Sequence, residues 1–137
     1  MATAVPTLPT PASLRGAAQA AAARGEPLVV MTTLKGCVYC ELVRNNYLAP
    51  MRRDGELVAV QIDVQDRQSN LQGFAGDMTT PADQARAWKA RFTPTVMFFG
   101  PDGTELAERL VGVAVPDFFG EYLSARLVEA RGKLKKN

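Results

Sequence analysis

Cys37 and Cys40 are the only cysteines of this 137-residue chain, and two residues separate them. They follow a short hydrophobic run and open a segment with helical periodicity, so we expect them at the N-terminus of a helix. Unpaired backbone N–H groups and the positive end of the helix dipole favour a thiolate at that position. A second cysteine one helical turn further on can attack a mixed disulfide formed at the first. The spacing predicts a thiol-disulfide redox site in which Cys37 attacks and Cys40 resolves.

A zinc site and a purely structural disulfide are the alternatives. Zinc is disfavoured because the chain has no histidine and no second cysteine pair to complete four ligands. A structural disulfide at this spacing would close a loop too short to restrict the unfolded chain much. The absence of histidine also excludes a histidine-based catalytic triad. We therefore expect no metal and no dissociable cofactor, the Cys37–Cys40 disulfide being the only redox group.

The length and composition indicate one domain with its own hydrophobic core, since 47% of the residues are hydrophobic. We expect a flexible segment at 1–9, the folded domain at 10–132 and a solvated basic tail at 133–137. The net charge is only +2, with four of the sixteen cations in the last seven positions, so no nucleic-acid surface is predicted. No apolar run approaches the roughly 18 residues of a membrane span. A monomer is the default expectation.

The N-terminal residues suggest export. Ala2-Thr3-Ala4 has the small-x-small form of a signal-peptide cleavage site, and a Thr/Pro-rich stretch follows it to Pro11. The alternative is the ordinary start of a cytoplasmic protein. The sequence favours a periplasmic or otherwise exported location.

Hydrophobic patterns in the first half of the chain predict a parallel β-α-β unit after an N-terminal helix. Continuous apolar runs at 27–33 and 57–64 are typical of strands covered on both faces. Helical spacing follows Cys37, and Pro50 is expected to end that helix. The N-terminal helix is expected to be capped by Thr10.

The second half predicts a loop, a helix, a hairpin and a last helix, for an overall order of α-β-α-β-α-β-β-α. The polar stretch 65–79 is expected to be an inserted loop, and Thr80 to cap the next helix. The inward face of that helix is expected to carry Ala85, Trp88 and Phe92, with Trp88 in the core rather than a substrate platform. Strands at 95–99 and 104–111 flank a turn. The last helix is expected to begin near Pro116 with Phe119, Leu123, Leu127 and Ala130 inward.

This order, with Cys-x-x-Cys after the first strand and Thr93-Pro94-Thr95 before the hairpin, resembles the thioredoxin superfamily over about 27–132. The resemblance implies an α/β thioredoxin-like fold, a central mixed four-stranded sheet flanked by helices, here with an extra N-terminal helix. It also implies a cis peptide bond before Pro94, beside the cysteines, which leaves the Thr93 backbone free to pair with an extended substrate segment. A trans proline that opens an edge strand is the alternative. The residues expected to bind the substrate are Thr93, Pro94, Gly36, Val38 and Tyr39.

Within the superfamily, the chain resembles the exported bacterial SoxW-type thioredoxin-like proteins. The resemblance lies in the loop at 71–78 leading into 85–88, in Thr93-Pro94-Thr95 and in 99–103. It implies a reductant of protein disulfides that is supplied with electrons by a membrane donor. The alternatives are a disulfide-introducing oxidase or isomerase, and a non-catalytic module that binds peptides at Thr93 and Pro94.

The active-site region departs from thioredoxin proper in several places. Thioredoxin has Gly-Pro between the cysteines, a tryptophan before the first, a buried aspartate six residues before it and a kink proline five residues after the second. This chain has Val38-Tyr39, Gly36, Met31 and Asn45 in those places. Without the carboxylate, water or a different group must accept the proton of Cys40. Lys35 favours a thiolate at Cys37 and Glu41 opposes it; the alternative for Lys35 is a solvated side chain with no such role.

Overall fold

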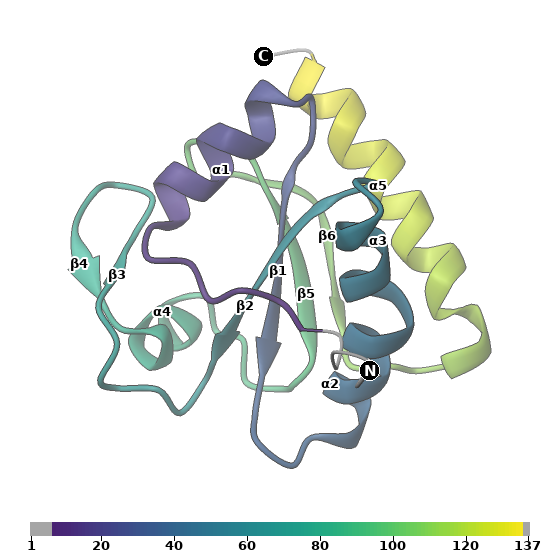
Figure 1. Cartoon of the computed structure of the whole chain (residues 1–137), viewed down its shortest axis with the longest axis horizontal. Coiled ribbons are helices and arrows are strands. Elements are labelled where there is room, and N and C mark those ends of the chain that lie inside the picture. Colours follow the sequence, from purple (N-terminus) through teal and green to yellow (C-terminus); the bar gives the residue numbers. More distant parts are fainter. Residues whose placement is uncertain (1–6, 136–137) are drawn as a thin grey trace, which may run out of the picture.

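The computed structural model describes residues 7–135 and contains a four-stranded sheet of order β2-β1-β5-β6 (Figure 1). Its strands are β1 (Leu28–Thr33), β2 (Val58–Asp63), β5 (Thr95–Phe99) and β6 (Glu105–Val111). β1 pairs in parallel with β2 and antiparallel with β5, which in turn pairs antiparallel with β6. The predicted mixed sheet is confirmed, and β1 and β2 end at the same end of the sheet.

Helices cover both faces of this sheet, as Figure 1 shows. They are α1 (Leu14–Ala23), α2 (Val38–Val43), α3 (Ala49–Arg53), α4 (Pro81–Ala87) and α5 (Phe119–Lys135), with a π-helical turn η1 (Arg44–Leu48) and a 3-10 turn η2 (Pro116–Phe118). α1 and α4 pack on one face, and the continuous α2-η1-α3 segment packs with α5 on the other. The extra N-terminal helix is confirmed. None of the helices described is long and apolar enough to cross a membrane.

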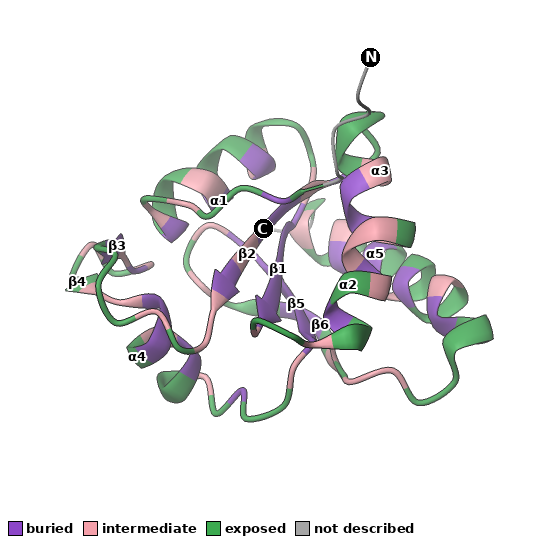
Figure 2. Ribbon diagram, turned by 60° about the horizontal axis from the view of Figure 1, so that its bottom comes forward, coloured by how far each residue is buried: buried purple, intermediate pink, exposed green. Residues whose placement is uncertain are grey.

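The core lies on both sides of the sheet, because the central strands bury both of their faces (Figure 2). All six residues of β1 are buried. Leu28 and Val30 contact the cluster under α1 and α4, whereas Val29 and Met31 contact the cluster under α2 and α5. This two-sided burial explains the apolar run without alternation. On α5 the four residues expected inward, Phe119, Leu123, Leu127 and Ala130, are all buried.

The N-terminal helix begins later than Thr10. Ser13, in an extended conformation, is the N-cap of α1, and its hydroxyl accepts the backbone N–H of Gly16 at 2.9 Å. Ahead of it the chain packs along the sheet, because Leu8 is buried and the carbonyl of Pro9 accepts the backbone N–H of Gln61 at 3.0 Å. Leu8 and Pro9, within the segment 1–9, thus already contact the folded domain. Ala2-Thr3-Ala4 lies outside the described residues.

Pro50 does not end the helix that follows the cysteines. It lies in the first turn of α3, and the helical path continues to Arg53. In a regular α-helix its ring would collide with the carbonyl four residues back. The preceding turn is instead π-helical, with the N–H of Ala49 bonded to the carbonyl of Arg44, and this wider turn accommodates the ring. The expectation of a helix end at Pro50 was therefore wrong.

The expected loop at 65–79 contains a small hairpin of its own. β3 (Leu71–Gln72) pairs antiparallel with β4 (Met78–Thr79), and the side chain of Leu71 is fully buried. Two-residue strands are too short to leave a period in the sequence. Between them, Phe74 packs against Trp88 and Phe99, and the Trp88 ring stacks on Phe99 at 4.9 Å between ring centroids. Trp88 is thus half-buried and packs against the core, on the side predicted for it.

Candidate active site

Cys37 occupies the N-cap of α2, at the end of the loop that leaves β1. The preceding Gly36 has φ of +83°, a left-handed conformation that glycine adopts without strain, and it turns the chain into the helix. The Cys37 Sγ atom accepts the backbone N–H of Cys40 at 3.2 Å. This donor and the helix N-terminus both stabilise negative charge on the sulfur. Cys37 therefore lies at a helix N-terminus, the position expected for it from the sequence.

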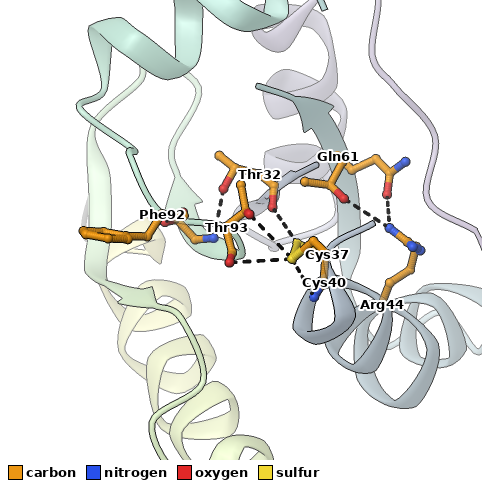
Figure 3. The surroundings of a disulfide bond; sticks show 9 residues. Thr32, Cys37, Cys40, Arg44, Gln61, Phe92 and Thr93 are labelled. Atoms are coloured by element: carbon orange, nitrogen blue, oxygen red, sulfur yellow. Dashed lines mark hydrogen bonds between the residues drawn. A yellow bond between two sulfur atoms is a disulfide. The ribbon is translucent and has the colours of Figure 1, made fainter. Parts of the chain in front are cut away.

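Cys40 is joined to Cys37 in a disulfide and lies on the inner side of it (Figure 3). The side chain of Cys40 is 1% exposed, and its Sγ atom lies 3.9 Å from the carbonyl oxygen of Thr32 on β1. Cys37 is only half-buried. A substrate can therefore reach the sulfur of Cys37, whereas the sulfur of Cys40 is shielded from solvent by the protein.

The loop before β5 supplies a third group to the disulfide. The Thr93–Pro94 peptide bond is cis, the conformer that the family resemblance implied. The Thr93 hydroxyl donates to Cys37 Sγ at 3.5 Å, and the Thr93 carbonyl oxygen lies 3.6 Å from the same sulfur. Thr95 anchors the loop, since its N–H donates to the Thr32 hydroxyl at 2.9 Å and its hydroxyl to the Phe92 carbonyl at 2.6 Å.

Exposed apolar side chains are chain neighbours of Cys37, Cys40 and Thr93. Val38 and Tyr39, which lie between the cysteines in the sequence, are 73% and 48% exposed, and Phe92 is 68% exposed. Phe92 was expected on the inner face of α4, and that expectation was wrong. The helix ends at Ala87 and Lys89 then adopts a left-handed φ of 57°, so the helical period does not reach Phe92.

A polar group lies beside the helix that carries the cysteines. Arg44, one turn after Cys40, donates through Nη1 to the side chain of Gln61 at 3.1 Å and to the hydroxyl of Thr33 at 3.4 Å (Figure 3). Met31, which is fully buried, occupies the place where thioredoxin proper has an aspartate. Met31 thus supplies no charge behind the disulfide, and Arg44 supplies a positive one beside it.

The structure places the sequence-predicted residues around one disulfide. Cys37, Cys40 and Thr93 are in contact, and Gly36, Val38, Tyr39 and Pro94 are their chain neighbours. Sequence reasoning did not name Thr32, Thr95, Arg44 or Phe92 for this site. Thr32 lies on β1 and Arg44 on the helical segment after Cys40, and nothing in the local sequence marks them as part of the site. Thr95 could have been found, because it follows Pro94 in the Thr93-Pro94-Thr95 motif. Within residues 7–135, no three His, Cys, Asp or Glu side chains are grouped as a metal site.

Comparison with known proteins identifies the class. The family model described as "Thioredoxin-like domain" matches residues 14–126, and the chain belongs to this family. A search of curated proteins found no match. Together with the Cys-x-x-Cys disulfide, the family defines the protein as a thiol-disulfide oxidoreductase.

Solved structures agree on the fold. Thioredoxin from Fasciola hepatica is similar with a TM-score of 0.57 and 18% identity, over 87% of this chain and 99% of that one. Oxidised thioredoxin O2 from Arabidopsis thaliana has a TM-score of 0.58 and 14% identity, over 92% and 99%. Thioredoxin NaTrxh from Nicotiana alata has a TM-score of 0.58 and 16% identity, over 93% and 99%. At these identities the likeness establishes the thioredoxin-like fold alone.

Proposed function

We propose that this enzyme reduces disulfides of other proteins, with Cys37 as the nucleophile and Cys40 as the resolving thiol. The observation that carries the proposal is the asymmetry of the pair. Cys37 is accessible and receives two hydrogen-bond donors, whereas Cys40 is 1% exposed and one helical turn behind it. A thiolate is needed at the first position and a protected thiol at the second.

The electron and atom balance of the reaction is simple. The Cys37 thiolate attacks one sulfur of the substrate disulfide, and the other substrate sulfur leaves as a thiolate that takes a proton from water. Cys40 then loses its proton and attacks Cys37 Sγ, which releases the second substrate thiolate. Two electrons have passed to the substrate, and the enzyme is left with the Cys37–Cys40 disulfide seen in the structure. A dithiol donor must reduce that disulfide before the next turnover.

We propose that water accepts the proton of Cys40. The Thr32 carbonyl, 3.9 Å from Cys40 Sγ, can accept an S–H hydrogen bond but cannot remove the proton. Met31 offers no base. Water must therefore reach the buried Cys40 thiol while the mixed disulfide is still intact, before Cys40 attacks it.

Substrate binding is assigned to the rim of the disulfide. Thr93 presents its backbone beside Cys37, so an extended segment can pair with it as a short added strand. Gly36 leaves open space above the backbone, since nothing lies within 4 Å of where its Cβ would be. Val38 and Tyr39 supply exposed apolar contacts, and Pro94 closes the other side.

The direction of electron flow, the location and the donor rest on the SoxW-type resemblance. It supports an exported, periplasmic bacterial reductant that is supplied by a membrane donor, and a monomer is the default. A disulfide-introducing oxidase or isomerase would use the same two cysteines, and a peptide-binding module would use neither.

The reduction potential of the Cys37–Cys40 couple separates these functions. The protein is equilibrated in graded thiol-disulfide buffers, and the oxidised fraction is measured by mass after alkylation. A potential near or below about −230 mV supports the reductant, and one above about −180 mV supports an oxidant or isomerase. The absence of a reversible couple would leave the binding module. As a control, Cys37→Ser must abolish insulin-disulfide reduction.

A further inference from the structure

A pocket of about 400 Å³ lies between the end of β2 and α4. Its floor is apolar and formed by Val64, Ala82, Ala85 and Ala90, and its rim carries four exposed cations, Arg67, Arg86, Lys89 and Arg91. Four cations around one small hollow repel one another, so the grouping favours a negatively charged occupant.

The four rim cations lack acidic partners. None of the ion pairs between residues 7–135 involves any of them. The acidic side chains at the end of β2 are turned to their own loop, since Asp63 accepts the N–H of Gln65 and Asp66 accepts those of Gln68 and Ser69. The positive charge is local, because the chain before its last seven residues carries fewer cations than acids.

The pocket adjoins the disulfide along two stretches of chain. Arg91 is two residues from Thr93, which places their Cα atoms within about 7 Å of each other. The Thr93 carbonyl oxygen lies 3.6 Å from Cys37 Sγ. On the other side, the N–H of Val64 donates to the carbonyl of Thr33, at the end of the strand that leads to Cys37. α4 and the ends of β1 and β2 share one end of the molecule in Figure 2.

The geometry points to a binding site for the carboxylates of an acidic segment that flanks the reacting cysteine of the substrate protein. This inference rests on the proposed disulfide chemistry and names its substrate class. A peptide paired with Thr93 that continues past Phe92 arrives at Arg91 and the pocket.

Two mixed-disulfide peptides test this assignment. Both carry a thionitrobenzoate group on one cysteine and have the same sequence, except that three glutamates beside the cysteine in one are glutamines in the other. The second-order rate constant of thionitrobenzoate release by the pre-reduced enzyme is measured at low and high salt. The variants are Arg86→Gln/Arg91→Gln, Arg67→Gln/Lys89→Gln and, as a control with the same charge change, Arg52→Gln/Arg53→Gln on α3.

We expect the wild type to reduce the acidic peptide about tenfold faster than the neutral one at low salt, and the ratio to approach one at high salt. Both pocket variants should lower the ratio to about two or less without changing the rate for the neutral peptide, and the α3 control should keep the wild-type ratio. Equal rates for the two peptides, or a ratio unchanged by the pocket variants, would overturn the assignment. In that case the cations only complement the helix end or bind small anions.

The outcome for the disulfide chemistry is read separately. If the reduced enzyme reacts with neither peptide, the proposed reductase function fails. Binding of the same peptides with serine in place of cysteine to the oxidised enzyme, followed by amide NMR shifts of Ala82, Ala85 and Ala90, still tests the pocket. Binding of the acidic peptide alone supports it, and equal or absent binding of the two peptides refutes it.

Discussion

Cys37 and Cys40 differ in their access to water and in the groups that face them. Two donors, the Cys40 N–H and the Thr93 hydroxyl, point at Cys37 Sγ, and the Thr93 carbonyl oxygen also lies 3.6 Å from it, whereas the group facing Cys40 Sγ is an acceptor, the carbonyl oxygen of Thr32. Donors stabilise an anion and a carbonyl oxygen does not. The two sulfurs are therefore suited to different roles although they belong to one helical turn, and Cys37 is the one prepared as a thiolate.

We expect Phe92, which is exposed and next to Thr93 in the chain, to contribute to substrate binding rather than to stability. Because its side chain is 68% exposed, Phe92→Ala should change the free energy of unfolding by no more than about 0.5 kcal/mol. The rate of peptide-disulfide reduction should fall several-fold, because an apolar contact at the rim is lost. The matched control is Phe98→Ala in the core, where we expect a loss of about 3–5 kcal/mol. Urea unfolding and single-turnover kinetics measure both. Comparable destabilisation in the two variants would contradict the assignment of Phe92 to the surface.

At the scale of elements, the end of α4 contains a residue in a conformation that glycine usually supplies. The N–H of Ala90 bonds to the carbonyl of Ala85 and that of Lys89 to Arg86, a Schellman arrangement in which Lys89 is the left-handed residue. Lys89→Gly should therefore raise the free energy of unfolding by about 1 kcal/mol. Lys89→Ala removes the same charge but keeps the strain, so it should bring no such gain. Equal stabilities of the two variants in urea would show that the backbone conformation carries no cost.

The turn between β5 and β6 contributes to acid sensitivity. The Thr104 N–H bonded to the Asp102 carboxylate at 3.0 Å lowers the pKa of that group from its usual 3.8. A lowered pKa stabilises the folded state above the usual value and loses that contribution as the pH falls through the folded value. Asp102→Asn, which keeps an acceptor oxygen, should therefore flatten the decline of the urea midpoint below about pH 4. Midpoints measured from neutral pH to about pH 2.5 check this, and parallel curves for the two proteins would contradict it.

Sequence patterns predicted the elements whose burial leaves a clear hydrophobic pattern. In β1 this pattern is an unbroken apolar run, and in α5 it is a helical period of apolar residues. They failed where a tertiary contact decides the boundary. Ser13 rather than Thr10 caps α1, because the preceding chain is held along β2 through the Pro9 carbonyl. Pro50 stays within a helix because a π-turn makes room for it. Neither arrangement follows from local propensity.

The chemistry of the site was readable because its reacting residues are close in sequence. The two-residue separation of Cys37 and Cys40 identified them as a redox pair, and the family resemblance identified the Thr93-Pro94 motif. Thr32 and Arg44 were not found, since their proximity to the disulfide depends on the pairing of β1 with β5 and on the helix face that meets β2. Such partners are set by the assembled fold, not by neighbours in the chain.

At the scale of the whole molecule, the redox site is continuous with the core. Cys40 belongs to the cluster under α2 and α5, together with Met31 and Val43, and that cluster extends to Leu127 and Ala130 on the last helix. Reduction or oxidation of the disulfide therefore alters side-chain packing on this face of the sheet. Its redox state and the free energy of unfolding are thermodynamically linked.

This linkage predicts which form of the protein is more stable. If the enzyme is a reductant, folding must favour the Cys37–Cys40 disulfide more than the unfolded chain does. The oxidised form should then unfold at higher urea concentration than the reduced form. Every 30 mV, roughly, by which folding lowers the potential appears as about 1.4 kcal/mol of extra stability in the oxidised form.

Urea unfolding of the oxidised protein and of the thiol-reduced protein measures the difference. The Cys37→Ser/Cys40→Ser variant, which cannot form the disulfide, should show no effect of added thiol and serves as the control. A reduced form more stable than the oxidised form would contradict the reductant, because an enzyme whose folding stabilises the dithiol takes electrons from its substrates and introduces disulfides into them.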